Sequence, residues 1–483
     1  MDVSRAAALT DERMAAFRAE VDAPAVAYGL VKDGALVHAS GVGALDDGRA
    51  PGPDDVFRIA SMTKSFTASA VLLLRDRGLL RLDDELSAYL PWTAGLTASG
   101  GGSSIRIGDL LSMDAGFPTD DPWGDRHESL ALDAFDALVE YGITFARPPR
   151  TGYEYSNLGY ALLGRVVAVA SGTDYRDLVH AELLDPLGLS ATRYDARAVP
   201  SDRLVQGYAP TDAGLVAEPI TLPGAFSPMG GLHSSVRDLA VWVAGFQASW
   251  SGESTHPLGR WSRREMQEQH SFIATAAMPA TDDVPERVVA ASYGFGLVAE
   301  DDVRFGRVVS HTGGYPGFGS HMRWHPASGW GVIALGNRTY FPAHRICGTV
   351  LASIVEQHRA EHPADALATV WPRTREAMAV VESLVESWDD ALADRWFAPN
   401  VDLDRSRAER RAAVEGVRSR MGAFRRAATP VVSTTPAQVR WWLEGSEGSE
   451  GTAYAEVLLT PDREPLIQSL TVSTDPVLDT TWD

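Results

Sequence analysis

The stretch FRIASMTKSFTASAVLLLRDRG, residues 57–78, decides how this sequence is interpreted. From Ser61 onward its Ala and Leu residues follow a helical period, which predicts a helix that begins at the serine. The first turn of that helix is an S-x-x-K pattern ending at Lys64. Residues i and i+3 of a helix lie on one face, so we expect the hydroxyl and the amine to meet. The chain has only two lysines, Lys32 and Lys64, which makes a coincidental match less expected.

A serine and a lysine at this spacing indicate nucleophilic catalysis. A serine hydroxyl is a poor nucleophile until a neighbouring group takes its proton. Lysine can take the proton only when it is neutral, which requires desolvation or a nearby positive charge. The pattern therefore predicts that Ser61, activated by Lys64, forms an acyl-enzyme. The alternative from this segment alone is an ordinary surface lysine in a first helical turn.

A second pattern, Tyr155-Ser156-Asn157, follows a Pro- and Gly-containing loop and precedes a helix expected over residues 158–171. Tyrosine can act as a base or proton relay where a cation stabilises its anion. Asn157 can donate to a substrate carbonyl or hold Lys64. The alternative is that Ser156 or Asn157 simply caps the following helix.

A third pattern, His311-Thr312-Gly313-Gly314, ends a strand-like run. Glycines here would let a substrate backbone approach the strand edge. One backbone N–H of this run, together with that of Ser61, would form an oxyanion hole. The alternative is a Gly-rich hairpin with a surface histidine.

The three patterns occur together and in a characteristic order. In this order the sequence resembles the penicillin-recognising serine hydrolases, which include class C β-lactamases, DD-carboxypeptidases, D-aminopeptidases and β-lactamase-like esterases. The resemblance covers about residues 20–360. Further matching segments are FRIASMTKSF (57–66), IRIGDLLSMDAGF (105–117), GYEYSNLG (152–159), PLGL (186–189), MGGLHSSVRDL (229–239) and VSHTGGYPGF (309–318).

The resemblance implies a role for each matching residue. Ser61 corresponds to the acylated nucleophile and Lys64 to its base partner. Tyr155 is similar to the second proton shuttle, and Asn157 to the residue that contacts the substrate amide and the lysine. Gly314 would supply the second oxyanion N–H.

His311 stands where many members of these families have lysine. A permanent cation there helps to hold a β-lactam or peptide carboxylate, whereas histidine is only partly charged near neutral pH. We therefore expect a hydrolase of small esters or amides, esterase- or D-peptidase-like. The alternatives are acyl transfer or peptide cyclisation by the same residues, a β-lactamase, and a non-enzymatic binding module on a disabled hydrolase fold.

Some other residues are weaker candidates. Residues 117–129, FPTDDPWGDRHES, are interpreted as a loop over the pocket, with Trp123 as a substrate-binding wall; a plain surface loop is the alternative. His233 and Asp238 are expected to be structural. No His, Cys, Asp or Glu cluster has metal-ligand spacing, and no phosphate-binding loop follows a strand, so we predict no metal and no cofactor.

The periodicity predicts an α/β organisation. A hairpin near residues 24–41, a helix-rich middle, strands expected at 293–299, 306–311, 317–325 and 330–337, and a helix at 342–358 indicate one sheet closed by both chain ends. The resemblance implies an antiparallel sheet flanked by helices, with an all-helical insertion at about 82–222. Composition shifts after residue 363, which predicts domains 1–363 and 364–483. The second is expected to be a small α+β accessory domain with strands at 430–434, 437–443, 453–459 and 466–473, and a turn at GSEGSEG (445–451).

The bulk composition limits the partners. A net charge of −21 with no basic stripe argues against nucleic acid. One cysteine, Cys347, cannot form an internal disulfide. The first 20 residues lack the apolar core of a signal peptide, and no stretch is apolar enough to span a bilayer. We therefore expect a cytoplasmic protein that acts on a small-molecule or peptide substrate, with no membrane partner; the sequence does not indicate its oligomeric state.

Overall fold

The computed structural model describes residues 1–96, 104–251, 255–362, 370–427, 431–433, 435–445 and 451–474. The chain divides into two compact units, Met1–Glu361 and His362–Asp483. The sequence analysis placed a boundary close to this point, after residue 363. Within the described ranges, no helix combines the length and the apolar composition that a membrane crossing needs.

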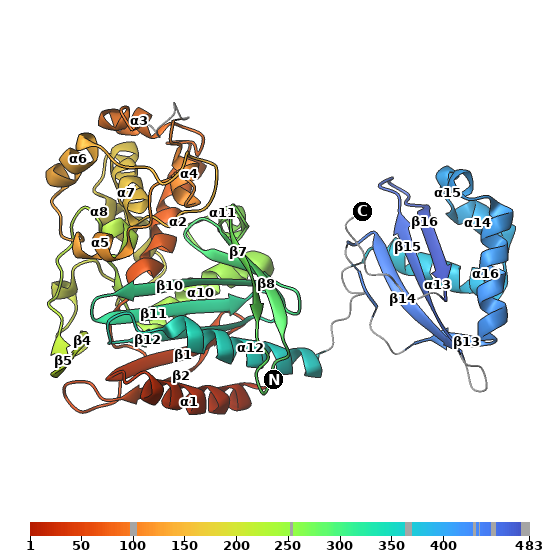
Figure 1. The fold of residues 1–483 in the computed structure, drawn as a ribbon, viewed down its shortest axis with the longest axis horizontal. Helices are drawn as coiled ribbons and strands as arrows, with labels where there is room; N and C mark the ends of the chain where they lie inside the picture. The colour runs from red at the N-terminus through yellow and green to blue at the C-terminus, as the bar shows by residue number, and fades with distance from the viewer. Residues whose placement is uncertain are drawn as a thin grey trace. The chain divides into compact units, whose positions relative to one another are not determined.

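The first unit is built on one eight-stranded sheet in which all neighbouring strands are antiparallel (Figure 1). Along the sheet the strands are β2 (Ala35–Gly43), β1 (Ala25–Lys32), β12 (Trp330–Gly336), β11 (Phe318–His325), β10 (Gly306–Tyr315), β9 (Val298–Asp302), β8 (Arg287–Tyr293) and β7 (Ser271–Met278). Because β1 pairs with β12, both ends of this unit's chain close the sheet, as the sequence predicts.

Both faces of the sheet are covered, and β12 in its interior is buried along its whole length. Helices α1 (Val3–Glu20) and α12 (Ala343–Glu361) lie on one face, where Tyr28 of β1 is part of their core (Figure 1). Helix α10 (Val236–Ser251) packs on β1 and β12 from the other face, where Ala27 belongs to the larger core. Because successive side chains of a strand point to opposite faces, β1 contributes to two separate hydrophobic layers.

The helical part of the unit surrounds α2 (Thr63–Asp76), which is buried from Thr63 to Leu74. The ring of Trp242 on α10 stacks on Phe66 at 3.8 Å and its indole N–H donates to Ser65, so α2 is fixed against α10. The other helices are α3 (Leu86–Tyr89), α4 (Ile107–Leu111), α5 (Asp121–Arg126), α6 (Leu132–Tyr141), α7 (Asn157–Ser171), α8 (Tyr175–Val179), α9 (Ser227–Gly230) and α11 (Arg260–Met266), with short helical turns at Ala60–Met62, Pro91–Thr93, His180–Leu184 and Ala196–Ala198.

Two features of the first unit differ from the prediction. The insertion at 82–222 contains a small hairpin, β4 (Tyr208–Thr211) and β5 (Gly214–Ala217), and is otherwise helical. The strand expected at 293–299 is instead a turn between β8 and β9, where Gly296 has a φ of +67° that favours glycine. The short strands β3 (Phe57–Arg58) and β6 (His233–Ser234) pair with each other beside the start of α2.

The second unit has its own sheet and its own core. Its strands are β13 (Phe424–Arg426), β14 (Gln438–Gly445), β15 (Thr452–Leu459) and β16 (Ile467–Ser473), and its helices are α13 (Pro372–Glu386), α14 (Asp390–Trp396), α15 (Pro399–Asp404) and α16 (Arg407–Met421). The prediction of a strand at 430–434 is wrong for the described residues 431–433, where only Val432 forms an isolated bridge. Residues 446–450 of the expected turn lie outside the described residues.

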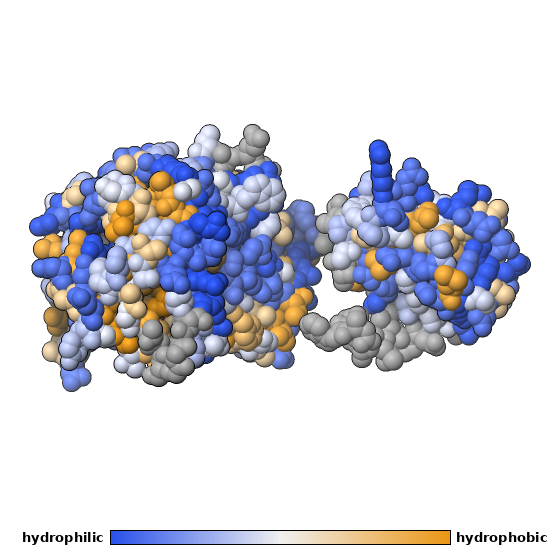
Figure 2. Space-filling model, turned by 90° about the horizontal axis from the view of Figure 1, so that it is seen from above, coloured by the Kyte–Doolittle hydropathy of each residue, from blue (hydrophilic) through white to orange (hydrophobic). Residues whose placement is uncertain are grey.

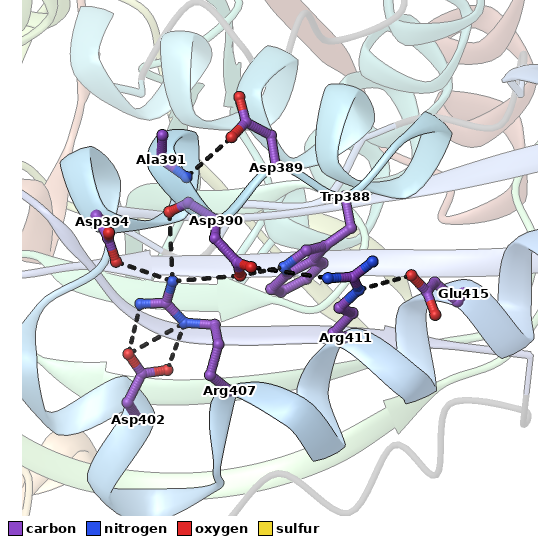
Figure 3. A network of polar contacts seen from close by, with 9 residues as sticks. All are labelled: Trp388, Asp389, Asp390, Ala391, Asp394, Asp402, Arg407, Arg411 and Glu415. Atoms are coloured by element: carbon purple, nitrogen blue, oxygen red, sulfur yellow. Dashed lines mark hydrogen bonds and ion pairs between the residues drawn. The ribbon is translucent and has the colours of Figure 1, made fainter.

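Charged residues hold the helices of the second unit together (Figure 3). The Arg407 guanidinium at the start of α16 donates to Asp402 on α15 and to Asp394 on α14. Arg411, one turn later, pairs with Asp390 and Glu415. One arginine therefore ties three helices to one another.

Hydrophilic residues cover most of the visible face of each unit, with hydrophobic residues in scattered patches between them (Figure 2). The large apolar side chains with high exposure, such as Tyr141 and Trp261, come from separate elements. Isolated exposed apolar residues of this kind are ordinary for a folded domain.

Candidate active site

Ser61 lies in a short 3₁₀ turn, Ala60–Met62, that connects β3 to α2. Ala60 has a φ of +47°, a conformation that is costly for a residue with a side chain. Such strain is often kept at functional sites, and here it sets the direction in which the chain enters α2. Ser61 is only 8% exposed.

Lys64 is fully buried, and its amine touches three oxygen atoms. Its Nζ lies 3.0 Å from Ser61 Oγ, 2.6 Å from Asn157 Oδ1 and 2.8 Å from the Met229 carbonyl oxygen. Burial lowers the pKa of Lys64 from its ordinary value to about 8, although carboxylates led by Asp121 oppose this shift. The expected meeting of hydroxyl and amine is therefore present, and a sizeable fraction of Lys64 is neutral near pH 8.

Tyr155 lies beside both of these residues. Its ring centroid is 4.8 Å from Lys64 Nζ. Burial, reinforced by the nearby charge of Asp121, raises the pKa of Tyr155 well above its ordinary value, and a hydrogen bond with Ser61 opposes the rise. Tyr155 is therefore a neutral phenol in the resting state, which suits a proton relay better than a standing phenolate base.

Asn157 is the first residue of α7, and its side chain faces the site. The helix is capped by Ser156, whose hydroxyl accepts a hydrogen bond from Gly159 N–H at 3.2 Å. The capping alternative thus holds for Ser156, whereas the amide of Asn157 contacts Lys64 through Oδ1 and Asp121 through Nδ2.

His311 is buried on β10 with both ring nitrogens engaged. Its Nδ1 lies 2.7 Å from the Thr312 carbonyl oxygen, which can only accept, so Nδ1 carries the proton. Its Nε2 lies 3.0 Å from the Tyr293 hydroxyl and therefore accepts from it. Burial, assisted by the Lys64 charge, lowers the pKa of His311 to about 3. The expectation of a partly charged histidine is wrong: this one is neutral and holds Tyr293.

The glycines of the third pattern bring β10 against the nucleophile turn. A Cβ on Gly313 would lie 2.2 Å from the Ile59 carbonyl oxygen, and one on Gly314 would lie 2.9 Å from the Tyr340 ring. The Ser320 hydroxyl of the next strand donates to the same Ile59 carbonyl at 2.8 Å. The glycines therefore allow the strand edge to reach the residues just before Ser61.

Trp123 lies on a short helix within the expected loop. Residues 117–129 contain the short helix α5, and Trp123 on it packs against Phe226 and His127, with ring centroids at 5.5 and 4.5 Å. Its 39% exposure makes it a rim residue, and a wall function stays a prediction. His233 and Asp238 are buried in structural hydrogen bonds, the former between β6 and Arg193, the latter with Thr192.

Several residues that meet at this site lie outside the three sequence patterns. Asp120 and Asp121 contact Asn157, and the Met229 carbonyl contacts Lys64. Asp125 is buried, and burial raises its pKa to about 7. The acidic run TDDPWGD was a visible signal for these carboxylates, but a backbone carbonyl leaves no trace in the sequence. Among the described residues, no group of three His, Cys, Asp or Glu side chains is placed to hold a metal ion.

Comparison with known proteins identifies the family. The family model described as Beta-lactamase matches residues 10–356, which is most of the chain. The chain belongs to the beta-lactamase family. Within this family, it is 29% identical over 297 residues to penicillin-binding protein 4* of Bacillus subtilis (strain 168), covering 59% of this chain and 61% of that protein. The matched segment thus spans less than two thirds of that relative.

Other members of the beta-lactamase family are also similar. The D-alanyl-D-alanine-carboxypeptidase/endopeptidase AmpH of Escherichia coli (strain K12) is 27% identical over 295 residues, covering 60% of this chain and 72% of that protein. The fold of the octameric penicillin-binding protein homologue from Pyrococcus abyssi aligns with a TM-score of 0.61 at 19% identity, over 97% of this chain and 100% of that one. Members of the family are serine hydrolases, and this chain has their fold.

Proposed function

We propose that this protein hydrolyses small esters or amide bonds through an acyl-enzyme on Ser61, with esterase- or D-peptidase-like specificity. The observation that carries the proposal is the buried Lys64 amine, 3.0 Å from Ser61 Oγ, in surroundings that lower its pKa to about 8. A neutral amine at hydrogen-bonding distance is what a serine hydroxyl needs to become a nucleophile.

The reaction follows from these positions. Ser61 Oγ attacks the substrate carbonyl carbon and gives its proton to Lys64. The N–H groups of Ser61 and Gly314 would hold the oxyanion. Lys64 and Tyr155 return the proton to the leaving group, and the same pair takes a proton from the water that releases the acyl group.

The surroundings of His311 support a substrate without a required carboxylate. A neutral histidine with both nitrogens engaged offers no charge to a β-lactam or peptide carboxylate. The nearby cation Arg58 is buried and paired with Glu128. This favours esters and uncharged amides over β-lactams, which is why we place β-lactamase activity second.

Turnover of p-nitrophenyl butyrate by the wild type and Ser61→Ala, with nitrocefin in parallel, tests the proposal. We expect ester turnover that falls by more than about 1,000-fold in Ser61→Ala, and little nitrocefin cleavage. Ester turnover that survives in the variant would contradict the role of Ser61. Rapid nitrocefin cleavage would show a β-lactamase instead. Added amine acceptors separate hydrolysis from acyl transfer, because transfer gives an amide product.

A further inference from the structure

Two consecutive carboxylates of the α5 segment accept hydrogen bonds from the first residues of α7. Asp120 accepts from the backbone N–H groups of Asn157 and Leu158 at 2.6 and 2.9 Å. Asp121 accepts from Asn157 Nδ2 at 2.9 Å. The approach is close, since a Cβ on Gly124 would lie 2.9 Å from Asn157 Cβ. The two segments therefore meet at the Asn157 side chain, which also contacts Lys64.

The number of hydrogens on Lys64 makes the orientation of Asn157 important. An ammonium has three N–H donors, and Lys64 has three oxygen partners. Neutral Lys64 has two N–H donors and one lone pair. Asn157 Oδ1 and the Met229 carbonyl can only accept, so they take the two donors. The lone pair is then left for the Ser61 hydroxyl, which is the partner that can donate.

This arrangement fails if the Asn157 amide turns over. A flipped amide would present Nδ2, a donor, to Lys64, and the lysine lone pair would then turn toward it instead of toward Ser61. Asp121 opposes the flip, because its carboxylate accepts from Nδ2 and would face Oδ1 after the flip.

We propose that Asp121 is a positioning residue, which holds the Asn157 amide with Oδ1 toward Lys64 and so directs the lone pair of Lys64 at Ser61. The inference rests on the proposed function. Asp121 lies outside the three active-site patterns, and this role gives a reason for the close approach of α5 to α7.

Asp121 also acts on Lys64 through its charge. The charged and titratable groups around Lys64 are Asp120, Asp121, Asp125 and Glu128 from the α5 region, Tyr155 and Tyr160 from the α7 region, and His311 from β10. Asp121 is the strongest of the carboxylates that raise the pKa of Lys64 against burial. Removing its charge therefore lowers the pKa of Lys64, which a purely structural residue would not do.

Two substitutions separate the hydrogen bond from the charge. Asp121→Asn removes the charge and keeps an acceptor for Asn157 Nδ2, but its own amide can also donate, so kcat at high pH falls by less than in Asp121→Ala. The acid limb of kcat/KM then moves down by roughly 1 pH unit, as expected when an opposite charge is removed. Asp121→Ala also removes the acceptor, and kcat falls by roughly 10- to 100-fold, as for a lost charge-assisted hydrogen bond.

Asp136→Asn is the matched control, because Asp136 pairs with Arg165 on α7 and lies outside the groups around Lys64; we expect an unchanged pH profile. Provided that Ser61→Ala is inactive, two results would overturn the inference. One is a wild-type kcat in Asp121→Ala. The other is an equal loss of kcat in both Asp121 variants with no movement of the acid limb. Turnover retained by Ser61→Ala would overturn the proposed function and this inference with it.

Discussion

At the scale of single residues, the proposed site depends on an amine whose pKa is lowered to about 8 by its surroundings. Lys64 loses hydration on burial, and the cost of a buried charge is larger than the help from the carboxylates nearby. Of its three oxygen partners, only the Ser61 hydroxyl can donate a hydrogen bond to the lone pair of neutral Lys64.

This balance predicts the pH dependence of turnover. The base must be neutral, and burial lowers the pKa of Lys64 to about 8. The kcat/KM for a neutral ester should therefore rise with pH and reach half of its plateau near pH 8. Stopped-flow or steady-state rates from pH 6 to 10, corrected for spontaneous hydrolysis, measure this. A profile that is already flat from pH 6.5 would contradict a lysine base.

His311 shows how a motif can be present while its chemistry differs. The sequence pattern predicts that His311 ends a strand, whereas the strand β10 continues to Tyr315. Nor does the pattern predict that Tyr293, at the end of β8, donates a hydrogen bond to Nε2. Asp121 was missed for a similar reason: its partner Asn157 comes from another helix, and a pairing of that kind depends on tertiary structure.

At the scale of elements, β10 and the turn before α2 must fit closely. Gly313→Ala places a methyl group 2.2 Å from a backbone oxygen that cannot move aside cheaply. We expect a loss of acylation of at least about 100-fold, or a free energy of unfolding lowered by about 2 kcal/mol or more. Fluorophosphonate labelling of Ser61 and denaturant unfolding measure the two effects.

Gly348 on α12 provides the control, since a Cβ there meets nothing within 4 Å. Gly348→Ala should leave labelling unchanged and raise stability by up to about 1 kcal/mol, because alanine favours the helix. Full labelling and wild-type stability in Gly313→Ala would contradict the prediction, because they would show that β10 can move away from the turn at no cost.

The elements that were predicted are those whose pattern is local. The helix α2 and the strands β1, β11 and β12 have strong periodicity, and their positions agree with the structure to within one or two residues at most ends. The edge strand β7 was missed, since its sequence SFIATAAM shows no alternation and its face is largely exposed. The hairpin β4–β5 was missed because its strands are short and exposed, which leaves no hydrophobic pattern.

At the scale of the whole molecule, the chain has two units with separate cores. Residues of the second unit, such as Trp441 and Val381, form a cluster of their own. We therefore expect two unfolding transitions in calorimetry, one for each unit.

Two substitutions assign these transitions. Arg407→Gln breaks the contacts that tie α14, α15 and α16 together, so it should lower one transition by a few degrees. Arg165→Gln removes the pair with Asp136 in the first unit and should lower the other. A single transition that both variants move would contradict independent units.

The scarcity of lysine has a practical consequence for chemical labelling. Lys64 is fully enclosed, whereas Lys32, at the end of β1, has a side chain that is 22% exposed. Apart from the chain's amino terminus, a dye or a solid support that couples to amines therefore has one lysine to reach. The protein can be tethered in a single orientation through the sheet, with the Lys64 amine left unmodified.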